Sequence, residues 1–264
     1  MRIPFTKAHG AANDFLLTWR NEAPPTGRVE ASIALCNRHT GIGADGWLLV
    51  SRSKEVDGEI QLYNSDGSEA EISGNGTRCA AAFLVDVGLA SDTVRIRTGA
   101  GVKVLRLIER RGLSFVFDMN MGCPQFPEGG QTTLDLSARP VAATIVDVGN
   151  PQCVIQVPDF DFDWVTMGAE IERHPRFPRR TNVSFVRRMD DHTLDVRFFE
   201  RGAGQTQSSG TGSTGAAAAA LRLGLVNSPV TVRTPAGPLQ LRQIEGEIYL
   251  AGPAQIIGGG EFYF

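Results

Sequence analysis

An internal repeat is the feature of this sequence that most restricts its possible folds. Moving the chain by 136 residues places "SGNGTRCAAAFLVDVGL", which begins at Ser73, over "SGTGSTGAAAAALRLGL", which begins at Ser209. The register continues without a gap, because "VRIRTGAG" from Val94 then matches "VTVRTPAG" from Val230. A match of this length at one offset indicates a duplicated structural unit.

Each copy predicts the same local structure. A polar, glycine-rich loop is followed by an alanine-rich helix, a glycine that can end the helix, and an alternating strand. We expect the helices over about 78–87 and 214–223, after the strand-like segments "GWLLVSR" and "GEIQLYN" in the first half and "TNVSFVRR" and "LDVRFFER" in the second. Because alanine side chains are small, a sheet can enclose such a helix on several sides. The sequence therefore predicts an α+β fold of two pseudo-symmetric domains, each a mainly antiparallel curled sheet around a central helix.

The length of the chain agrees with a two-domain organisation. A chain of 264 residues is longer than one average core requires. We expect the first domain over residues 1–115 and the second over residues 116–254. A C-terminal strand over residues 255–264 is expected to return to the first domain.

Charge and hydropathy restrict the kinds of partner. The 26 basic and 29 acidic residues give a net charge of -3, which provides no broad basic surface for nucleic acid or an anionic membrane. The segment "MRIPFTKAHGAANDF" lacks the apolar stretch of a secretion signal, and no segment approaches the roughly 18 apolar residues of a membrane span. We therefore expect a cytoplasmic protein that binds a small molecule.

The cysteines and histidines form no disulfide or metal-binding pattern. The cysteines lack CxxC spacing, and the histidines form no HExxH or Cys/His cluster. The sequence predicts no metal site and no disulfide, with free and mostly buried thiols. These residues are Cys36, Cys79, Cys123 and Cys153, and His9, His39, His174 and His192.

Both glycine-rich segments precede a predicted helix. A helix N-terminus offers backbone N–H groups without a partner in the helix and a partial positive charge, so both segments can hold an anion. Two such segments around one carboxylate would also stabilise the negative charge that develops when the neighbouring carbon loses a proton. Pseudo-twofold symmetry then places Ser73 and Ser209 on opposite sides of that carbon. Proton transfer on opposite faces is what inversion of a stereocentre requires.

A dinucleotide site is a competing interpretation of one segment. "GTGSTG", residues 210–215, fits the GxGxxG pattern, which needs a strand immediately before it and an acidic residue about 20 positions later. The strand-like "LDVRFFE" ends about ten residues earlier, and residues 225–240 contain no Asp or Glu. Because both the preceding strand and the later acidic residue are missing, the sequence disfavours a dinucleotide cofactor.

Six segments, in the same order, resemble the diaminopimelate epimerase family. They are "HGAANDF" at 9–15, "CNRHTGIGADG" at 36–46, "NSDGSEAEISGNGTRC" at 64–79, "VGNPQCV" at 148–154, "RTNVSFV" at 180–186 and "ERGAGQTQSSGTG" at 200–212. The resemblance implies a cofactor-independent isomerase that interconverts LL- and meso-diaminopimelate in lysine synthesis. It also implies two pseudo-symmetric domains with the amino-acid substrate between them, and a homodimer.

The resemblance also implies a set of substrate-binding residues. According to the resemblance, backbone amides hold the carboxylate beside the reacting carbon, asparagines line the pocket, and an arginine pairs with the distal carboxylate. These residues are Gly74, Asn75, Gly210 and Thr211; Asn13, Asn64, Asn150 and Asn182; and Arg201. Helix-end amides and a bidentate arginine both suit carboxylates. Asparagine beside glycine or proline also serves turns, and "ERG" at 200–202 also fits an exposed strand end.

The match differs from the family at its catalytic positions. The two catalytic cysteines of the family are Ser73 and Ser209 here, and the usual histidine of the "GNPH" segment is Gln152. The acidic partner is kept as Glu200, which is expected to influence how the serines ionise. An aliphatic hydroxyl costs on the order of 6 kcal/mol more to ionise than a thiol. The implied catalytic set of Ser73, Ser209, Glu200 and Gln152 therefore predicts slow turnover.

Three explanations of the serines stay open. In the first, the serines are replacements introduced to trap a substrate complex. In the second, they are native residues of an isomerase or dehydratase that acts on another amino acid. In the third explanation the protein binds an amino acid without converting it.

Overall fold

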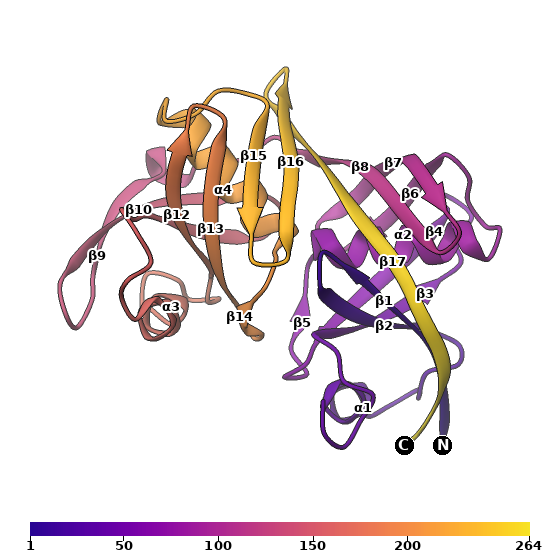
Figure 1. Ribbon diagram of the computed structural model, residues 1–264. Helices are drawn as coiled ribbons and strands as arrows, with labels where there is room; N and C mark the ends of the chain where they lie inside the picture. The colour runs from indigo at the N-terminus through magenta and orange to yellow at the C-terminus, as the bar shows by residue number, and fades with distance from the viewer. The chain divides into compact units, whose positions relative to one another are not determined.

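The computed structural model describes residues 1–264, apart from the side chain of Glu128. The chain divides into two compact units, which are residues 1–119 together with 251–264, and residues 120–250. Each unit contains one 13-residue helix whose sides are covered by strands (Figure 1).

In the first unit, strands surround the helix α2. Its elements are β1 (Arg2–Gly10), β2 (Asn13–Trp19), α1 (Arg28–Cys36), β3 (Gly46–Ser51), β4 (Gly58–Asn64), β5 (Glu69–Ala70), α2 (Gly74–Asp86), β6 (Thr93–Thr98), β7 (Gly101–Arg111) and β8 (Ser114–Gly122). β1 is antiparallel to β2, β2 is parallel to β3, and β3 is antiparallel to β4. β4 pairs in parallel with β6, and an antiparallel run of β6, β7 and β8 follows. The last strand, β17 (Glu247–Tyr263), pairs with both β8 and β1 and so closes the ring of strands.

The second unit repeats this order of pairing around the helix α4. Its elements are η1 (Pro127–Gly129), β9 (Gln131–Asp135), β10 (Pro140–Asp147), β11 (Pro151–Gln156), α3 (Trp164–Glu172), β12 (Asn182–Asp190), β13 (Thr193–Glu200), β14 (Gly204–Thr206), α4 (Gly210–Arg222), β15 (Val230–Thr234) and β16 (Gly237–Ile244). β10 is antiparallel to β11, β11 is parallel to β12, and β12 is antiparallel to β13. β13 pairs in parallel with β15, which is antiparallel to β16. The predicted fold class, a duplicated and mainly antiparallel sheet around a helix, is confirmed.

The alanines of the repeat lie in the cores of the two units. Ala80–Ala82 and Ala216–Ala220 are buried. α2 contacts β1, β2, β3, β4 and β6, while α4 contacts β10, β11, β12, β13, β15 and β16. A helix with larger side chains on several faces would overfill a ring of strands drawn this closely around it.

Both central helices begin earlier than the sequence predicts. α2 starts at Gly74 and α4 at Gly210, so the glycine-rich segments form the first helical turns and not loops. Glycine has a low helix propensity, which favours the loop prediction. The structure overrides that preference because Ser73 and Ser209 cap the two helices. The predicted closing glycines are confirmed, since Gly88 and Gly224 have positive φ angles of 73° and 68° just after the helices.

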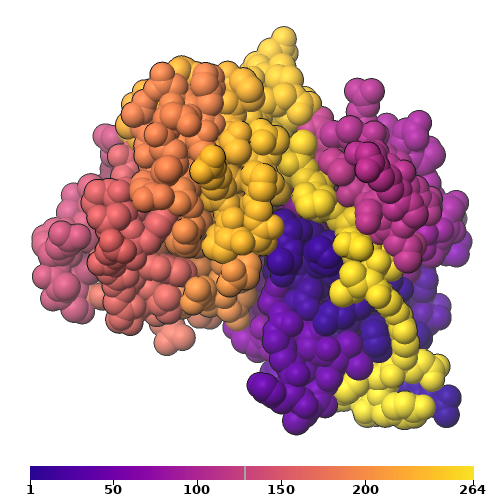
Figure 2. Space-filling view, in the orientation of Figure 1, coloured from indigo at the N-terminus to yellow at the C-terminus, as the bar shows by residue number. Residues whose placement is uncertain are grey.

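The C-terminal part of β17 lies on the surface of the first unit. It pairs with β1 from Arg2 to His9, and residues 257–261 are exposed along its course (Figure 2). Within the described part of the chain, no helix has the length and apolar character needed to cross a membrane.

Candidate active site

The α2 entrance, which we define as residues 73–76, has an ordered helix cap. Ser73 adopts extended backbone angles of φ -127° and ψ 123°, and its Oγ accepts a hydrogen bond from the Gly76 backbone N–H at 3.1 Å. The backbone N–H groups of Gly74 and Asn75 lie in the first turn, where an α-helix supplies no carbonyl partner. They point toward the side from which an anion approaches a helix N-terminus.

The α4 entrance, residues 209–212, has the same backbone geometry. Ser209 has φ -137° and ψ 122°, and its Oγ accepts from the Gly212 backbone N–H at 3.0 Å. A Cβ atom at Gly212 would lie 2.7 Å from Cδ1 of Phe198, so only glycine fits the first turn against this strand. The repeat therefore builds two helix starts with equivalent capping geometry, one in each unit.

A carboxylate distinguishes the α4 entrance from the α2 entrance. The Ser209 hydroxyl donates to Glu200 Oε2 at 2.7 Å, and the Thr206 hydroxyl donates to Glu200 Oε1 at 2.7 Å. Glu200 ends β13 as Asn64 ends β4, at the same offset as the rest of the repeat. Asn64 Nδ2 donates to Ser68 Oγ at 3.0 Å. Ser209 therefore has a proton acceptor at the position where the first unit has an amide.

A chain of side-chain hydrogen bonds fixes two asparagines of the first unit. Arg78 Nη2 donates to Asn75 Oδ1, and Asn75 Nδ2 donates to Asn13 Oδ1 at 3.1 Å. Asn13 Nδ2 in turn donates to Asp45 Oδ2 at 2.7 Å. Because a guanidinium can only donate and a carboxylate accepts, the two ends of the chain determine how both amides are oriented.

The carboxylate end of this chain belongs to a charged cluster. Arg38 Nη2 contacts Asp14 Oδ1 at 2.7 Å and Asp45 Oδ1 at 2.8 Å, and Lys7 Nζ lies 3.1 Å from Asp14 Oδ2. Burial opposes ionisation of Asp14, but hydrogen bonds from Arg38 and Lys7 outweigh it and lower the Asp14 pKa. Burial, followed by the neighbouring charge of Asp14, raises the pKa of Asp45. The two carboxyl groups therefore differ in acidity although they share Arg38.

Amide side chains also form a connected group in the second unit. Gln152 is fully buried and its Nε2 donates to Asn150 Oδ1 at 2.7 Å, while Asn150 Nδ2 lies 3.4 Å from Thr211 Oγ1. Asn182 Nδ2 donates to Pro151 O at 3.0 Å. The residues predicted for this half of the pocket thus lie at the ends of β11 and β12 and at the start of α4.

Asn182 also contacts the segment that carries Arg201. Its Oδ1 accepts from the Arg201 backbone N–H at 3.1 Å, and Arg201 Nη1 donates to Arg179 O at 3.2 Å. Buried Glu172 accepts from the Gly202 backbone N–H at 3.2 Å and pairs with Arg180 and Arg173. Glu172 therefore anchors the turn in which Arg201 lies.

We expect Glu172→Gln to lower the free energy of unfolding by about 2–3 kcal/mol, because Arg180 then loses its buried counter-ion. Urea denaturation followed by circular dichroism measures the change. Glu109→Gln is the matched control, since Glu109 pairs with Arg111 on the surface, and a change of about 0.5 kcal/mol or less is expected there. Equal losses in the two variants would contradict the anchoring role of Glu172.

The thiols lie apart from this chemistry. All four cysteines are free; Cys36, Cys79 and Cys153 are buried, as predicted, whereas Cys123 is exposed. Burial raises the pKa of each buried thiol to about 12. Cys79 and Cys153 are close in sequence to the predicted site, but thiols of this acidity are poor proton acceptors at neutral pH.

We expect one thiol, that of Cys123, to react with a chromogenic disulfide reagent in the native protein at pH 8, and four to react after unfolding. At this pH a thiol with a pKa of about 12 is ionised to roughly one part in 10⁴. Cys123→Ser should remove the native reaction. Rapid native labelling of that variant would show that a buried thiol is accessible.

Sequence reasoning missed four polar residues that organise these sites. Arg78 and Asp45 orient the asparagines of the first unit, Glu172 anchors the Arg201 turn, and Thr206 donates to Glu200. The i, i+3 spacing of Asn75 and Arg78 was a usable signal, because it places both on one face of a helix.

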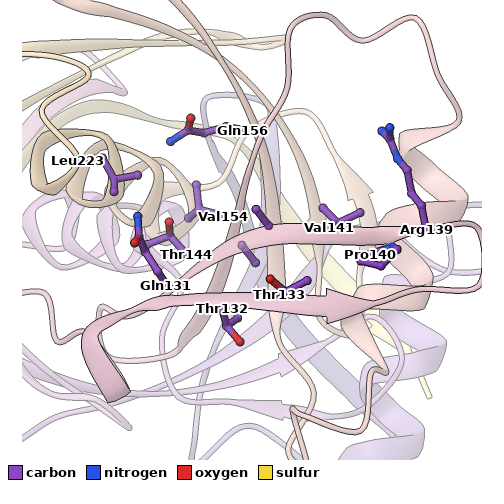
Figure 3. A pocket seen from close by; sticks show the side chains of 12 residues that line it. Gln131, Thr132, Thr133, Arg139, Pro140, Val141, Thr144, Val154, Gln156 and Leu223 are labelled. Carbon is purple, nitrogen blue, oxygen red and sulfur yellow. The ribbon is translucent and has the colours of Figure 1, made fainter.

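A groove elsewhere in the second unit carries no comparable chemistry. It lies over β9 and β10 and is lined by side chains such as Thr133, Val141, Val154 and Leu223, with Arg139 at its edge (Figure 3). None of the residues that the structure describes around it belongs to the predicted site. The described residues also contain no group of three or more His, Cys, Asp or Glu side chains arranged to hold a metal ion.

Comparison with known proteins identifies the family. The family model for diaminopimelate epimerase matches residues 5–127 and 144–257. This chain belongs to the diaminopimelate epimerase family. The diaminopimelate epimerases of Pelotomaculum thermopropionicum and Moorella thermoacetica are each 37% identical to it, over 98% of both chains. The sequence resemblance is confirmed, and the chain is an isomerase of this family.

Solved structures of diaminopimelate epimerase-like fold support the same conclusion at the level of the fold. A hydroxyproline epimerase from Agrobacterium vitis matches with a TM-score of 0.79 and 15% identity, over 98% of this chain and 92% of that one. A PhzF-family phenazine biosynthesis protein from Bacillus anthracis matches with a TM-score of 0.72 and 13% identity over the whole of both chains. These identities are low, so both structures bear on the architecture only.

Proposed function

We propose that this member of the diaminopimelate epimerase family interconverts LL- and meso-diaminopimelate by moving the α-proton without a cofactor. The observation that carries the proposal is the duplicated helix entrance, in which Ser73 and Ser209 occupy equivalent cap positions. Each serine lies beside backbone N–H groups that favour a carboxylate. In the proposed reaction the two hydroxyls serve opposite faces of one carbon.

Substrate binding in this proposal uses the polar groups of both units. The first-turn amides of Gly74 and Asn75, and of Gly210 and Thr211, hold the α-carboxylate and stabilise the enolate-like charge that follows proton loss. Arg201 pairs with the distal carboxylate. The ammonium and carboxylate groups of the substrate also meet the pocket amides, which are Asn13, Asn64, Asn150 and Asn182.

The two proton-transfer groups differ in strength. Glu200 accepts a hydrogen bond from the Ser209 hydroxyl at 2.7 Å. A proton that Ser209 takes from the substrate can therefore pass on to this carboxylate. Within the first unit, the residue equivalent to Glu200 is Asn64, which cannot accept a proton at neutral pH. We therefore propose Ser209 with Glu200 as the stronger acid–base group, Ser73 as the weaker one, and Gln152 as a group that positions Asn150.

A second candidate function is recognition of an amino acid without conversion, or conversion of another amino acid by isomerisation or dehydration. The serines at positions 73 and 209 favour this alternative, because hydroxyls are far less acidic than the thiols of the family. Stereochemical inversion needs a proton-transfer group at both positions, whereas binding needs neither group.

Solvent-deuterium exchange at the α-carbon, followed by NMR over a panel of amino acids, tests the proposal. Exchange and inversion of LL-diaminopimelate above the uncatalysed rate support the epimerase. Tight binding without exchange supports the binding protein, and exchange of another amino acid identifies a different substrate. Absence of both binding and exchange across the panel contradicts the proposal and its alternative.

A cytoplasmic location and a homodimer are further parts of the proposal, both taken from the family resemblance. Multi-angle light scattering of the purified protein measures the oligomeric state. Cell fractionation measures the location.

A further inference from the structure

Arg78 is a cation that lies fully buried in the first unit. It lies in α2, has a relative exposure of 0%, and is among the largest fully buried side chains of the molecule. No carboxylate of the described residues forms an ion pair with it, although arginine is almost never fully buried unless it is paired. This charge needs an explanation beyond stability.

The guanidinium occupies a space that is shaped for it. Its Nε donates to Pro253 O at 3.1 Å, its Nη2 donates to Asn75 Oδ1, and its buried Nη1 has no hydrogen-bond partner among the described residues. A Cβ atom at Gly252 would lie 2.9 Å from the Arg78 Cζ. Glycine at 252 therefore leaves the room in which the guanidinium lies.

Keeping this charge in the interior is costly. Burial of an ion without a counter-ion costs several kcal/mol. Loss of solvent lowers the Arg78 pKa to about 10, so the side chain remains protonated at neutral pH. In a stabilising salt bridge, attraction to a carboxylate offsets this cost. Arg78 has no such carboxylate partner among the described residues.

The position of Arg78 relates its charge to the α2 entrance. The residue that accepts from Nη2 is Asn75, whose own backbone N–H lies in the first turn of α2. The positive charge therefore lies behind the residue that presents an anion-binding amide. It has the same sign as the helix N-terminus, so the two fields add.

We propose that Arg78 supplies the counter-charge for the carboxylate that binds at the α2 entrance, and that it acts through Asn75 as a positioning residue. This inference rests on the proposed function, in which that carboxylate belongs to an amino-acid substrate. The bound anion then supplies a counter-charge for the buried guanidinium, which forms no ion pair with a carboxylate of the described residues. Because the Arg78 charge attracts an anion, the α2 entrance should bind a carboxylate more tightly than a neutral group.

Pimelate, which has the two carboxylates of diaminopimelate and no amines, is a suitable probe because it is predominantly a dianion from pH 6 to pH 9.5. Isothermal titration calorimetry with LL-diaminopimelate and with pimelate gives the dissociation constants. We expect Arg78→Gln, which keeps a donor but removes the charge, to weaken binding of both compounds roughly 10- to 100-fold at every pH. Arg110→Gln is the matched control, because Arg110 forms an exposed pair with Asp86 at the far end of α2; a change below about twofold is expected there.

Arg78→Lys gives a readout that a purely structural role would not produce. Burial lowers the pKa of a lysine, so this variant should bind pimelate well at pH 6 and progressively more weakly toward pH 9.5. The wild-type affinity should change little over the same range. This pH dependence also tests the proposal if Arg78→Gln does not fold.

Two results overturn the inference alone: wild-type affinity in Arg78→Gln, or an affinity of Arg78→Lys that is independent of pH. If the wild-type protein binds neither LL-diaminopimelate nor pimelate, the proposed function fails as well. The wild-type titration therefore distinguishes the two failures.

Discussion

The double substitution Ser73→Cys and Ser209→Cys is expected to raise the rate of LL-diaminopimelate epimerisation by at least about 10³-fold. Both serines cap a helix, and the positive end of a helix lowers the pKa of a thiol at that position. The thiolate is accessible at neutral pH, whereas the alkoxide costs on the order of 6 kcal/mol more. Chromatographic separation of the LL and meso isomers during the reaction measures the rate.

Single substitutions separate the two proposed proton-transfer groups, Ser73 and Ser209. With one thiol, we expect the α-proton to exchange with solvent faster than the stereocentre inverts, since only one face is served well. Ser208→Cys is the matched control, because Ser208 is a buried serine adjacent to Ser209, and no gain is expected there. If the double variant binds LL-diaminopimelate and still gives no meso isomer, the assigned substrate is wrong.

Glu200→Gln is expected to reduce α-proton exchange by about 10²-fold or more. The wild-type carboxylate accepts hydrogen bonds from both Ser209 and Thr206 at 2.7 Å. A glutamine side chain keeps the size of this group but cannot take up a proton at neutral pH. Incorporation of deuterium from solvent, followed by NMR, measures exchange without requiring inversion.

Thr206→Val is the control for Glu200→Gln. It removes one hydrogen bond to Glu200 and leaves the carboxylate, so we expect exchange to fall by less than about tenfold. A Glu200→Gln variant that exchanges at the wild-type rate would show that the Ser209 proton does not pass to Glu200.

The fold was largely predictable because the sequence repeats itself. The strand-like "GEIQLYN" corresponds to β4 at Gly58–Asn64, and both central helices were found from their alanines. The first turns of α2 and α4 were missed because glycine propensity favours a loop, while the capping by Ser73 and Ser209 depends on backbone geometry. Propensity is a local quantity, whereas the strands packed around these turns come from distant parts of the chain.

The polar residues around the predicted site were harder to find. The serines and Glu200 stand in motifs that resemble a known family, so sequence alone proposed them. Arg78 donates a hydrogen bond to the carbonyl of Pro253, and Glu172 accepts one from the backbone N–H of Gly202. Such contacts join positions far apart in sequence, and no local pattern reports them.

The unequal partners of the two repeated serines have a consequence for kinetics. A perfectly symmetric duplication would supply the same proton-transfer group twice, but β13 ends in Glu200 where β4 ends in Asn64. In the proposed mechanism, removal of the α-proton by Ser73 is therefore harder than its removal by Ser209 with Glu200. Primary deuterium isotope effects measured from the two isomers should differ, with the larger value reporting the direction in which breaking the carbon–hydrogen bond limits the rate.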